Sequence, residues 1–235
     1  MNKSTFQALL LLIIFILIIG TGIFLFYDNQ IFNDYSLYDV SNVGSSDNGT
    51  VYKVVAGNES SNQSIGIILG IHPREHEIHK AMLSTFYQLC GAPNAPKNLT
   101  KKYVIYYVEV NNNITGYQES RAAGEGLGQE FIVPNIIKDN VSMVVDLHMI
   151  DESYEFYNFI FPVTDDPISN EYANFIANYL SIANYNFTEG TSPLKITVPI
   201  AESGIPAMVI EFDINSNNST QNAQKVIQAL EELKI

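Results

Sequence analysis

Beyond residue 48, the chain alternates between short apolar runs and longer segments whose apolar residues recur at helical spacing. The apolar runs, rich in β-branched residues, predict buried strands at residues 51–56, 65–71, 103–110, 141–148 and 207–212, with a further strand at 156–161. The helical spacing predicts helices at residues 73–89, 167–183 and 219–233. Strands that alternate with helices are typical of α/β proteins, so we expect one domain with a central mixed, largely parallel sheet flanked by helices.

One segment inside this domain shows neither period. Residues 111–133 are glycine-rich, and we expect them to be irregular. Structureless stretches of this length in compact domains are usually functional, so the segment is a candidate for substrate contacts.

The first 48 residues follow a different pattern. Residues 8–26 carry no charge and are mostly Leu, Ile and Phe, which is about the length needed to cross ~30 Å of hydrocarbon as a helix. A cleaved signal peptide and a buried helix are the alternatives, but a signal's apolar core has about 7–15 residues and a small-residue cleavage site. We therefore expect a transmembrane signal anchor at 8–26, a tail at 1–7, a polar stalk at 27–48 and the folded domain at 49–235.

The orientation of this anchor follows from its flanking charge. Lys3 precedes the apolar run, so we expect a single-pass protein of the cell membrane with a cytoplasmic N-terminus and an extracellular domain. Asn-x-Ser/Thr sequons fit such a location and make glycosylation a hypothesis, although an Asn-rich composition alone also produces them. The sequons begin at Asn48, Asn58, Asn62, Asn98, Asn113, Asn140, Asn186, Asn217 and Asn218.

Composition excludes several classes of function. The net charge of −13 argues against nucleic-acid binding, which needs clustered Lys and Arg. A single cysteine, Cys90, excludes an internal disulfide and any cysteine-based metal cluster. We interpret Cys90 as a small buried residue at a helix end.

Candidate chemistry follows the strand predicted at residues 65–71. Pro73 favours the first turn of a helix, so the strand should stop at His72 and a helix should begin near Pro73. His72 and Glu75 would then lie at the carboxyl end of a central strand, where open α/β sheets place ligands. An imidazole and a carboxylate three residues apart can converge on one Zn²⁺.

Two other predicted strands end in residues that complete this chemistry. His148 would supply the third ligand of a hydrolytic zinc site, which leaves one position for water. Such a site needs a general base, and Glu211 closes an apolar strand that has no structural need for an acid. Asp146 points to the same strand face as His148 and could hold the second nitrogen of its imidazole. Taken singly, His148 could instead be a core histidine and Glu211 a solvent-facing strand end.

The same histidine also fits a different zinc motif. His72-x-x-Glu75-His76 matches the inverted zincin pattern, in which both histidines lie on one helix. The apolar run into His72 and the proline after it oppose a helix there. We therefore expect His76, and likewise His79, to be solvated helix residues.

With these residues placed, the chain resembles the zinc carboxypeptidases and their relatives, the succinylglutamate desuccinylase/aspartoacylase group. Gly70-Ile-His-Pro-Arg-Glu75 closely matches the family's strand-to-loop motif, and the resemblance spans roughly residues 50 to 235. It implies a zinc-dependent hydrolase of amide bonds in peptides or acyl-amino acids. It further implies that zinc binds His72, Glu75 and His148, that Glu211 is the base, that Arg74 lines the cleft, and that Arg121 polarises the carbonyl and stabilises the oxyanion.

The chain also departs from this family at two places. The positions that match the Asn-Arg pair clamping the substrate carboxylate are Gly128 and Gln129, which leaves Gln129 as the substrate-binding candidate. No tyrosine lies between Tyr185 and Glu211, where the family has one before its catalytic glutamate. The alternative function is therefore a non-catalytic binding module for peptide or cell-surface ligands.

Overall fold

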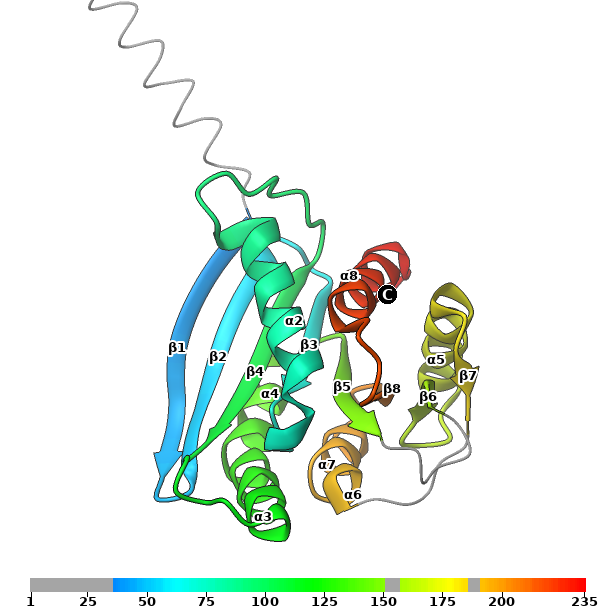
Figure 1. Cartoon of the computed structure of the whole chain (residues 1–235). Coiled ribbons are helices and arrows are strands. Elements are labelled where there is room, and N and C mark those ends of the chain that lie inside the picture. Colours follow the sequence, from blue (N-terminus) through cyan, green and yellow to red (C-terminus); the bar gives the residue numbers. More distant parts are fainter. Residues whose placement is uncertain (1–35, 151–156, 186–190) are drawn as a thin grey trace, which may run out of the picture. The chain divides into compact units, whose positions relative to one another are not determined.

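The computed structural model describes residues 36–150, 157–185 and 191–235 (Figure 1). Within these ranges, no helix is both long enough and apolar enough to cross a membrane. The membrane segment expected at residues 8–26 and the tail at 1–7 lie outside the described ranges.

One sheet runs through the described part of the chain. Its eight strands lie in the order β1-β2-β4-β3-β5-β8-β6-β7. The four central strands, β4, β3, β5 and β8, are parallel to their neighbours in that group. The pairs β1–β2, β2–β4 and β6–β8 are antiparallel, and β7 pairs parallel with β6. The strands are β1 (Ser36–Ser46), β2 (Gly49–Asn58), β3 (Ser64–Leu69), β4 (Lys102–Val110), β5 (Met143–Ile150), β6 (Phe159–Pro162), β7 (Ala183–Asn184) and β8 (Ala207–Asp213). The predicted mixed, largely parallel sheet is confirmed.

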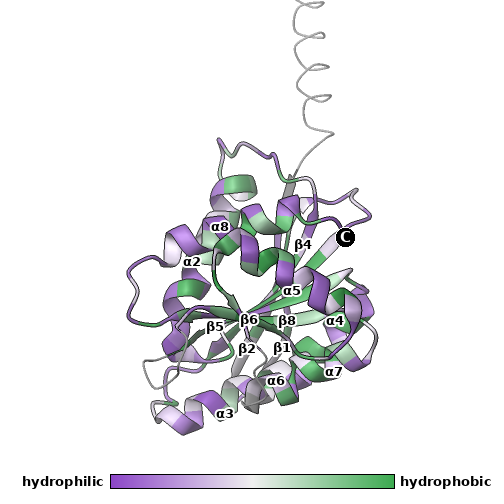
Figure 2. Cartoon of the chain, turned by 90° about the vertical axis from the view of Figure 1, so that its right-hand side faces the viewer, coloured by the Kyte–Doolittle hydropathy of each residue, from purple (hydrophilic) through white to green (hydrophobic). Residues whose placement is uncertain are grey.

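Helices cover both faces of this sheet, and the apolar clusters show which helix lies on which face. One cluster packs α2 (His76–Phe86), α5 (Pro167–Leu180) and α8 (Ser219–Glu232) against one side of the strands. A second cluster packs α4 (Val133–Asp139), α7 (Thr197–Glu202) and the end of α3 (Tyr117–Leu127) against the other side. The short helix α6 (Thr191–Lys195) contacts α3 and α7. Figure 2 shows apolar strands between these two layers of helices.

The central strands read as continuous apolar runs because both of their faces are covered. Every residue of β5 is buried. In β3, Ile65, Ile67 and Leu69 belong to the α2 side of the core, whereas Ile68 belongs to the opposite side. This alternation places successive side chains in different clusters, as strand geometry requires.

The stalk predicted at residues 27–48 is wrong in the part that the structure describes. Residues 36–46 form β1, which pairs antiparallel with β2 through a bulge between Asn42 and Gly44. Because β1 is an edge strand, most of its described side chains are exposed, and it carries little of the apolar pattern that identified the other strands. The folded domain therefore includes residues 36–48, upstream of the boundary expected at residue 49.

The segment 111–133 is also not irregular, since most of it is α3 and the π-helical turn η3 (Gly128–Ile132). One of its glycines, Gly124, allows close packing. A Cβ added at Gly124 would lie 1.9 Å from the carbonyl oxygen of Ile71, the residue before His72. The missing side chain thus lets α3 lie directly against the end of the central strand.

This close approach gives a stability prediction. Gly124→Ala should destabilise the full-length protein by about 1–3 kcal/mol, because the new methyl group meets backbone that cannot rotate away. Gly126→Ala on the same helix is the matched control: nothing lies within 4 Å of an added Cβ there. Alanine also favours helices over glycine by about 1 kcal/mol, so the control should be at least as stable as wild type. Urea unfolding checks both, and equal midpoints would contradict the packing argument.

Candidate active site

Three candidate ligands converge at the carboxyl ends of β3 and β5. His72 has an extended backbone, and the 3-10 turn η1 (Pro73–Glu75) begins directly after it, as the proline predicts. This turn directs Glu75 back toward His72, with 2.8 Å between His72 Nδ1 and Glu75 Oε1. The neighbouring strand β5 brings His148 Nδ1 to 2.9 Å from the other carboxylate oxygen, Oε2. All three side chains are buried, and their donor atoms lie within 4.8 Å of one another.

A glycine at the end of β3 makes this geometry possible. Gly70 has φ +83°, in the left-handed region that side chains disfavour, and a Cβ there would lie 2.3 Å from the carbonyl oxygen of Val108. The strand can therefore turn into His72 while staying close to β4.

The electrostatics of the cluster stabilise positive charge at its centre. Burial by itself would raise the pKa of Glu75, but His148 and His72 lower that pKa well below its usual value. Burial would likewise lower the pKa of His148, but Asp146 and Glu75 raise it well above the usual value. Asp146 and Glu75 therefore stabilise a proton on His148. Metal ions bind to sites of this kind by displacing such protons.

The donor set fits zinc. Two imidazole nitrogens and one carboxylate are the protein ligands of a hydrolytic zinc site, and here the three side chains form one buried group. A carboxylate also lies near the second ring nitrogen, Nε2, of each histidine. Asp146 Oδ1 lies 3.1 Å from His148 Nε2, although too poorly aligned for a hydrogen bond. Glu125 Oε1 lies 3.4 Å from His72 Nε2. Such carboxylates orient metal-binding imidazoles.

Asp146 thus lies where the sequence predicts it, whereas Glu125 was not predicted. Glu125 is on α3, four residues after Arg121. Residues four apart share one face of a helix, so this spacing would have grouped the two residues if the segment had been identified as helical.

Glu211 stands beside the candidate ligands on the next strand. Its register partner in β5 is His148. Glu211 Oε2 is buried without a hydrogen-bond partner among the described residues. Burial raises the pKa of Glu211 to about 8; nearby Glu75 and Asp146 also raise it, while His148 and Arg121 lower it. Glu211 thus places a buried carboxyl oxygen beside the ligand group, where a general base would act once this proton is lost.

Both arginines of the chain lie at this site. Arg121 Nη1 is 3.1 Å from Glu75 Oε1. The guanidinium of Arg74 lies 4.7 Å from the ring centroid of Tyr117, and that of Arg121 lies 5.6 Å from the same centroid. Gln129, in contrast, is exposed in η3, and no contact within the described ranges joins it to the His72–Glu75–His148 group. The structure therefore brings together every predicted site residue except Gln129.

The two remaining histidines differ from each other. The side chain of His76 is 46% exposed and lies 3.0 Å from Glu77, so it does not join the ligand group. The inverted zincin reading is thereby excluded. His79 is not solvated as predicted: it is buried, its Nε2 lies 2.9 Å from the Leu147 carbonyl oxygen, and burial lowers its pKa to about 4. A neutral His79 donates to that carbonyl and ties α2 to β5 next to His148.

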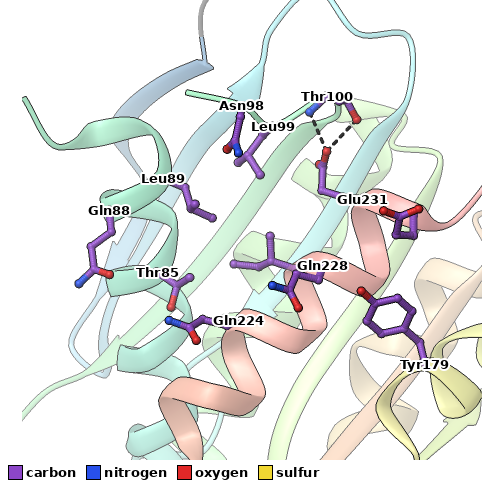
Figure 3. A pocket seen from close by; sticks show the side chains of 12 residues that line it. Thr85, Gln88, Leu89, Asn98, Leu99, Thr100, Tyr179, Gln224, Gln228 and Glu231 are labelled. Carbon is purple, nitrogen blue, oxygen red and sulfur yellow. Dashed lines mark hydrogen bonds between the residues drawn. The ribbon is translucent and has the colours of Figure 1, made fainter. Parts of the chain in front are cut away.

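The structure also has a groove of about 840 Å³ that does not belong to this site (Figure 3). It runs between α2, the π-helical turn η2 (Tyr87–Gly91) and α8. Exposed amide side chains line it, among them Gln88, Gln224 and Gln228. None of the candidate catalytic residues contributes to its wall.

Comparisons with known proteins bear on the fold. No family model and no curated protein matches the sequence. The structure is similar to a metallo-carboxypeptidase from Burkholderia cenocepacia, with a TM-score of 0.59 and 14% identity over 83% of this chain and 64% of that one. It is also similar to a metallo-carboxypeptidase from Pseudomonas aeruginosa in complex with (2-guanidinoethylmercapto)succinic acid. For this pair the TM-score is 0.58, and the identity is 14% over 82% of this chain and 64% of that one.

A succinylglutamate desuccinylase/aspartoacylase from Rhodobacter sphaeroides is similar too, with a TM-score of 0.55 and 14% identity over 85% of this chain and 64% of that one. The chain thus spans 64% of the length of these three proteins. The fold expected from the sequence motif is confirmed.

Proposed function

We propose that this protein is a zinc-dependent hydrolase of amide bonds in peptides or acyl-amino acids. The observation that carries the proposal is the buried convergence of His72, Glu75 and His148, with the buried Oε2 of Glu211 on the adjoining strand. The similar folds of metallo-carboxypeptidases and of a desuccinylase/aspartoacylase support it.

In this proposal each residue has a separate task. His72, Glu75 and His148 would hold one Zn²⁺, which lowers the pKa of a bound water and polarises the scissile carbonyl when present. Glu211 accepts the proton of the attacking water and then donates it to the leaving amine. Arg121 stabilises the negative charge that develops on the carbonyl oxygen. Asp146 and Glu125 orient the two imidazoles.

Metal content tests the proposal. We expect about one Zn²⁺ per chain in full-length protein purified without chelator, because three-ligand sites hold one ion. His148→Ala should lose most of it, since only two ligands remain. His76→Ala is the matched control and should keep its zinc, because the exposed side chain of His76 lies against Glu77 and is not one of the converging ligands. A wild-type protein that is metal-free and does not take up added zinc would contradict the proposal.

A non-catalytic binding module remains the second candidate, favoured by one observation. Gln129 lies apart from the site, so the side chain at the position of the family's carboxylate-binding arginine makes no contact there. A binding module would hold zinc without turnover. Zinc-loaded protein that hydrolyses no member of a panel of peptides and acyl-amino acids would support it.

We also propose that residues 8–26 anchor the protein in the cell membrane, with the domain outside. The uncharged run and the position of Lys3 support this orientation. Protease added to intact cells should digest the domain while a cytoplasmic marker protein stays intact. Digestion that occurs only after lysis would reverse the orientation.

A further inference from the structure

The ring of Tyr117 contacts both arginines of the chain. The guanidinium of Arg74 lies 4.7 Å from the centroid of this ring, and that of Arg121 lies 5.6 Å from it. Both distances are within the ~6 Å over which the negative face of an aromatic ring attracts a cation. The three side chains come from two elements, since Arg74 belongs to the turn η1 and the other two belong to α3. One ring therefore lies against both guanidinium groups of the candidate site.

The place of Tyr117 in the helix explains this arrangement. Tyr117 is the first residue of α3, and Arg121 follows four residues later. Residues four apart are neighbours on one face of a helix, so the ring and the guanidinium of Arg121 meet there. Arg74 reaches the same ring from the turn that carries Glu75. The ring thus links the start of α3 to the turn that holds a candidate zinc ligand.

Burial of apolar surface explains little of an aromatic residue at this position. Tyr117 is 44% exposed, so much of the ring that could be buried remains in water. Tyr179, with a similar exposure of 42%, packs its ring on Phe175 of the same helix. The partners of the Tyr117 ring are instead two cations.

Arg121 has a second contact, but it shares that contact with another residue. Its Nη1 lies 3.1 Å from Glu75 Oε1, and the same oxygen lies 2.8 Å from His72 Nδ1. The side chain of Arg121 is 27% exposed, and a long side chain held by one shared oxygen keeps much of its rotamer freedom. A planar guanidinium stacks well on an aromatic face, and such a contact removes part of that freedom.

We propose that Tyr117 is a positioning residue, whose ring holds Arg121 for the developing oxyanion and Arg74 for contact with the substrate. This inference rests on the proposed hydrolase function and adds a residue that supports it. Tyr117 acts through the two arginines, because donors that are already in place need not reorganise while the charge develops.

Nuclear magnetic resonance tests this positioning without a substrate. Because the chain has two arginines, zinc-loaded full-length protein with isotope-labelled arginine gives two side-chain Nε signals. In wild type both Nε groups should be ordered on the ps–ns timescale, measured as a high order parameter. Tyr117→Leu keeps an apolar side chain without a ring, so both order parameters should fall. Tyr117→Phe should keep them high, because it retains the ring face.

Kinetics test what the positioning contributes. Tyr117→Leu should lower kcat on an amide substrate by about 10- to 100-fold, because a misplacement of ~1 Å can cost about 10²-fold. Tyr117→Phe should stay within about 3-fold of wild type, because the contact with both cations remains. Tyr179→Leu is the matched control, a tyrosine of similar exposure on α5, and it should change neither kcat nor the arginine signals.

A double-mutant cycle separates positioning from a structural role. If Tyr117 acts through Arg121, Tyr117→Leu should cost little further activity once Arg121→Met has removed the guanidinium. If Tyr117 only stabilises the fold, the fold-loss in kcat should be the same in both backgrounds, and the urea midpoint should fall with it. Equal losses would therefore overturn the proposal.

The signals of the two arginines keep this inference apart from the hydrolase function. Order parameters that stay at their wild-type values in Tyr117→Leu would overturn the role of Tyr117, whatever the activity. If both order parameters fall and the zinc-loaded wild type hydrolyses no amide substrate, the hydrolase function alone is overturned, and the ring still positions both arginines.

Discussion

Glu211→Gln is expected to retain zinc and to lower kcat by about 10²–10⁴-fold, the range that general acid–base catalysis contributes. Glutamine preserves the size of the side chain and its place beside His148 on β8. It cannot accept a proton from water. Zinc content by mass spectrometry and kcat on an amide substrate measure the two expectations separately.

The pH dependence should change in the same variant. Burial raises the pKa of Glu211 to about 8, and the positive charge of a bound zinc ion would lower it from there. Glu211 acts as a base only when ionised, so kcat/KM of wild type should rise with pH to a plateau as this proton is lost. Glu211→Gln should lack that rise, because no group at this position titrates.

A second glutamate provides the control. Glu202 is exposed at the end of α7, and Glu202→Gln should keep both zinc and the wild-type rate. If Glu211→Gln loses zinc together with activity, Glu211 is a ligand and the assignment of Glu75 is wrong. If it keeps the wild-type rate, the base is another residue.

The sequence predicted the candidate site because its chemistry lies at strand ends. His72, His148 and Glu211 each follow or close an apolar run, and the carboxyl ends of parallel strands meet at one edge of a sheet. The order of the strands was not needed for that inference. The structure places β3, β5 and β8 side by side, which brings the three ends together.

The contacts that were missed depend on helices whose signals were weak. Glycines in α3 concealed a helix, so Glu125 was not placed behind His72. The contact between Glu125 and Lys195 joins residues 70 positions apart, and no local pattern reports such a pairing. Only the packing of α3 against α6 creates it.

His79 differs from these, because its burial could have been predicted. It lies four residues after Glu75 and three before Met82, which puts it on the face of α2 that packs on the sheet. A polar residue on an apolar helix face usually has a buried partner, here the carbonyl of Leu147.

The membrane segment at residues 8–26 stays a prediction.

Arg121→Lys is expected to lower kcat by about 10²–10³-fold, the cost of removing one donor to a developing oxyanion. In the wild type, Arg121 extends from α3 and its Nη1 lies 3.1 Å from Glu75 Oε1. Lysine keeps the positive charge but loses the planar fork of the guanidinium. The donor would therefore stand in the wrong place although the local charge is unchanged. Zinc should remain bound, since Arg121 is not one of the three converging donors.

Arg74→Lys is the matched comparison for this variant. Arg74 is exposed and lies over Tyr117 without a hydrogen bond to the ligand group among the described residues. A residue that only lines the site stabilises the bound substrate and the transition state equally. Its replacement should therefore raise KM more than it lowers kcat. Wild-type kcat in Arg121→Lys would show that the oxyanion is stabilised by another group. A loss of zinc would show instead that Arg121 holds Glu75 in place as a ligand, and the fall in kcat would then follow the metal content of the sample.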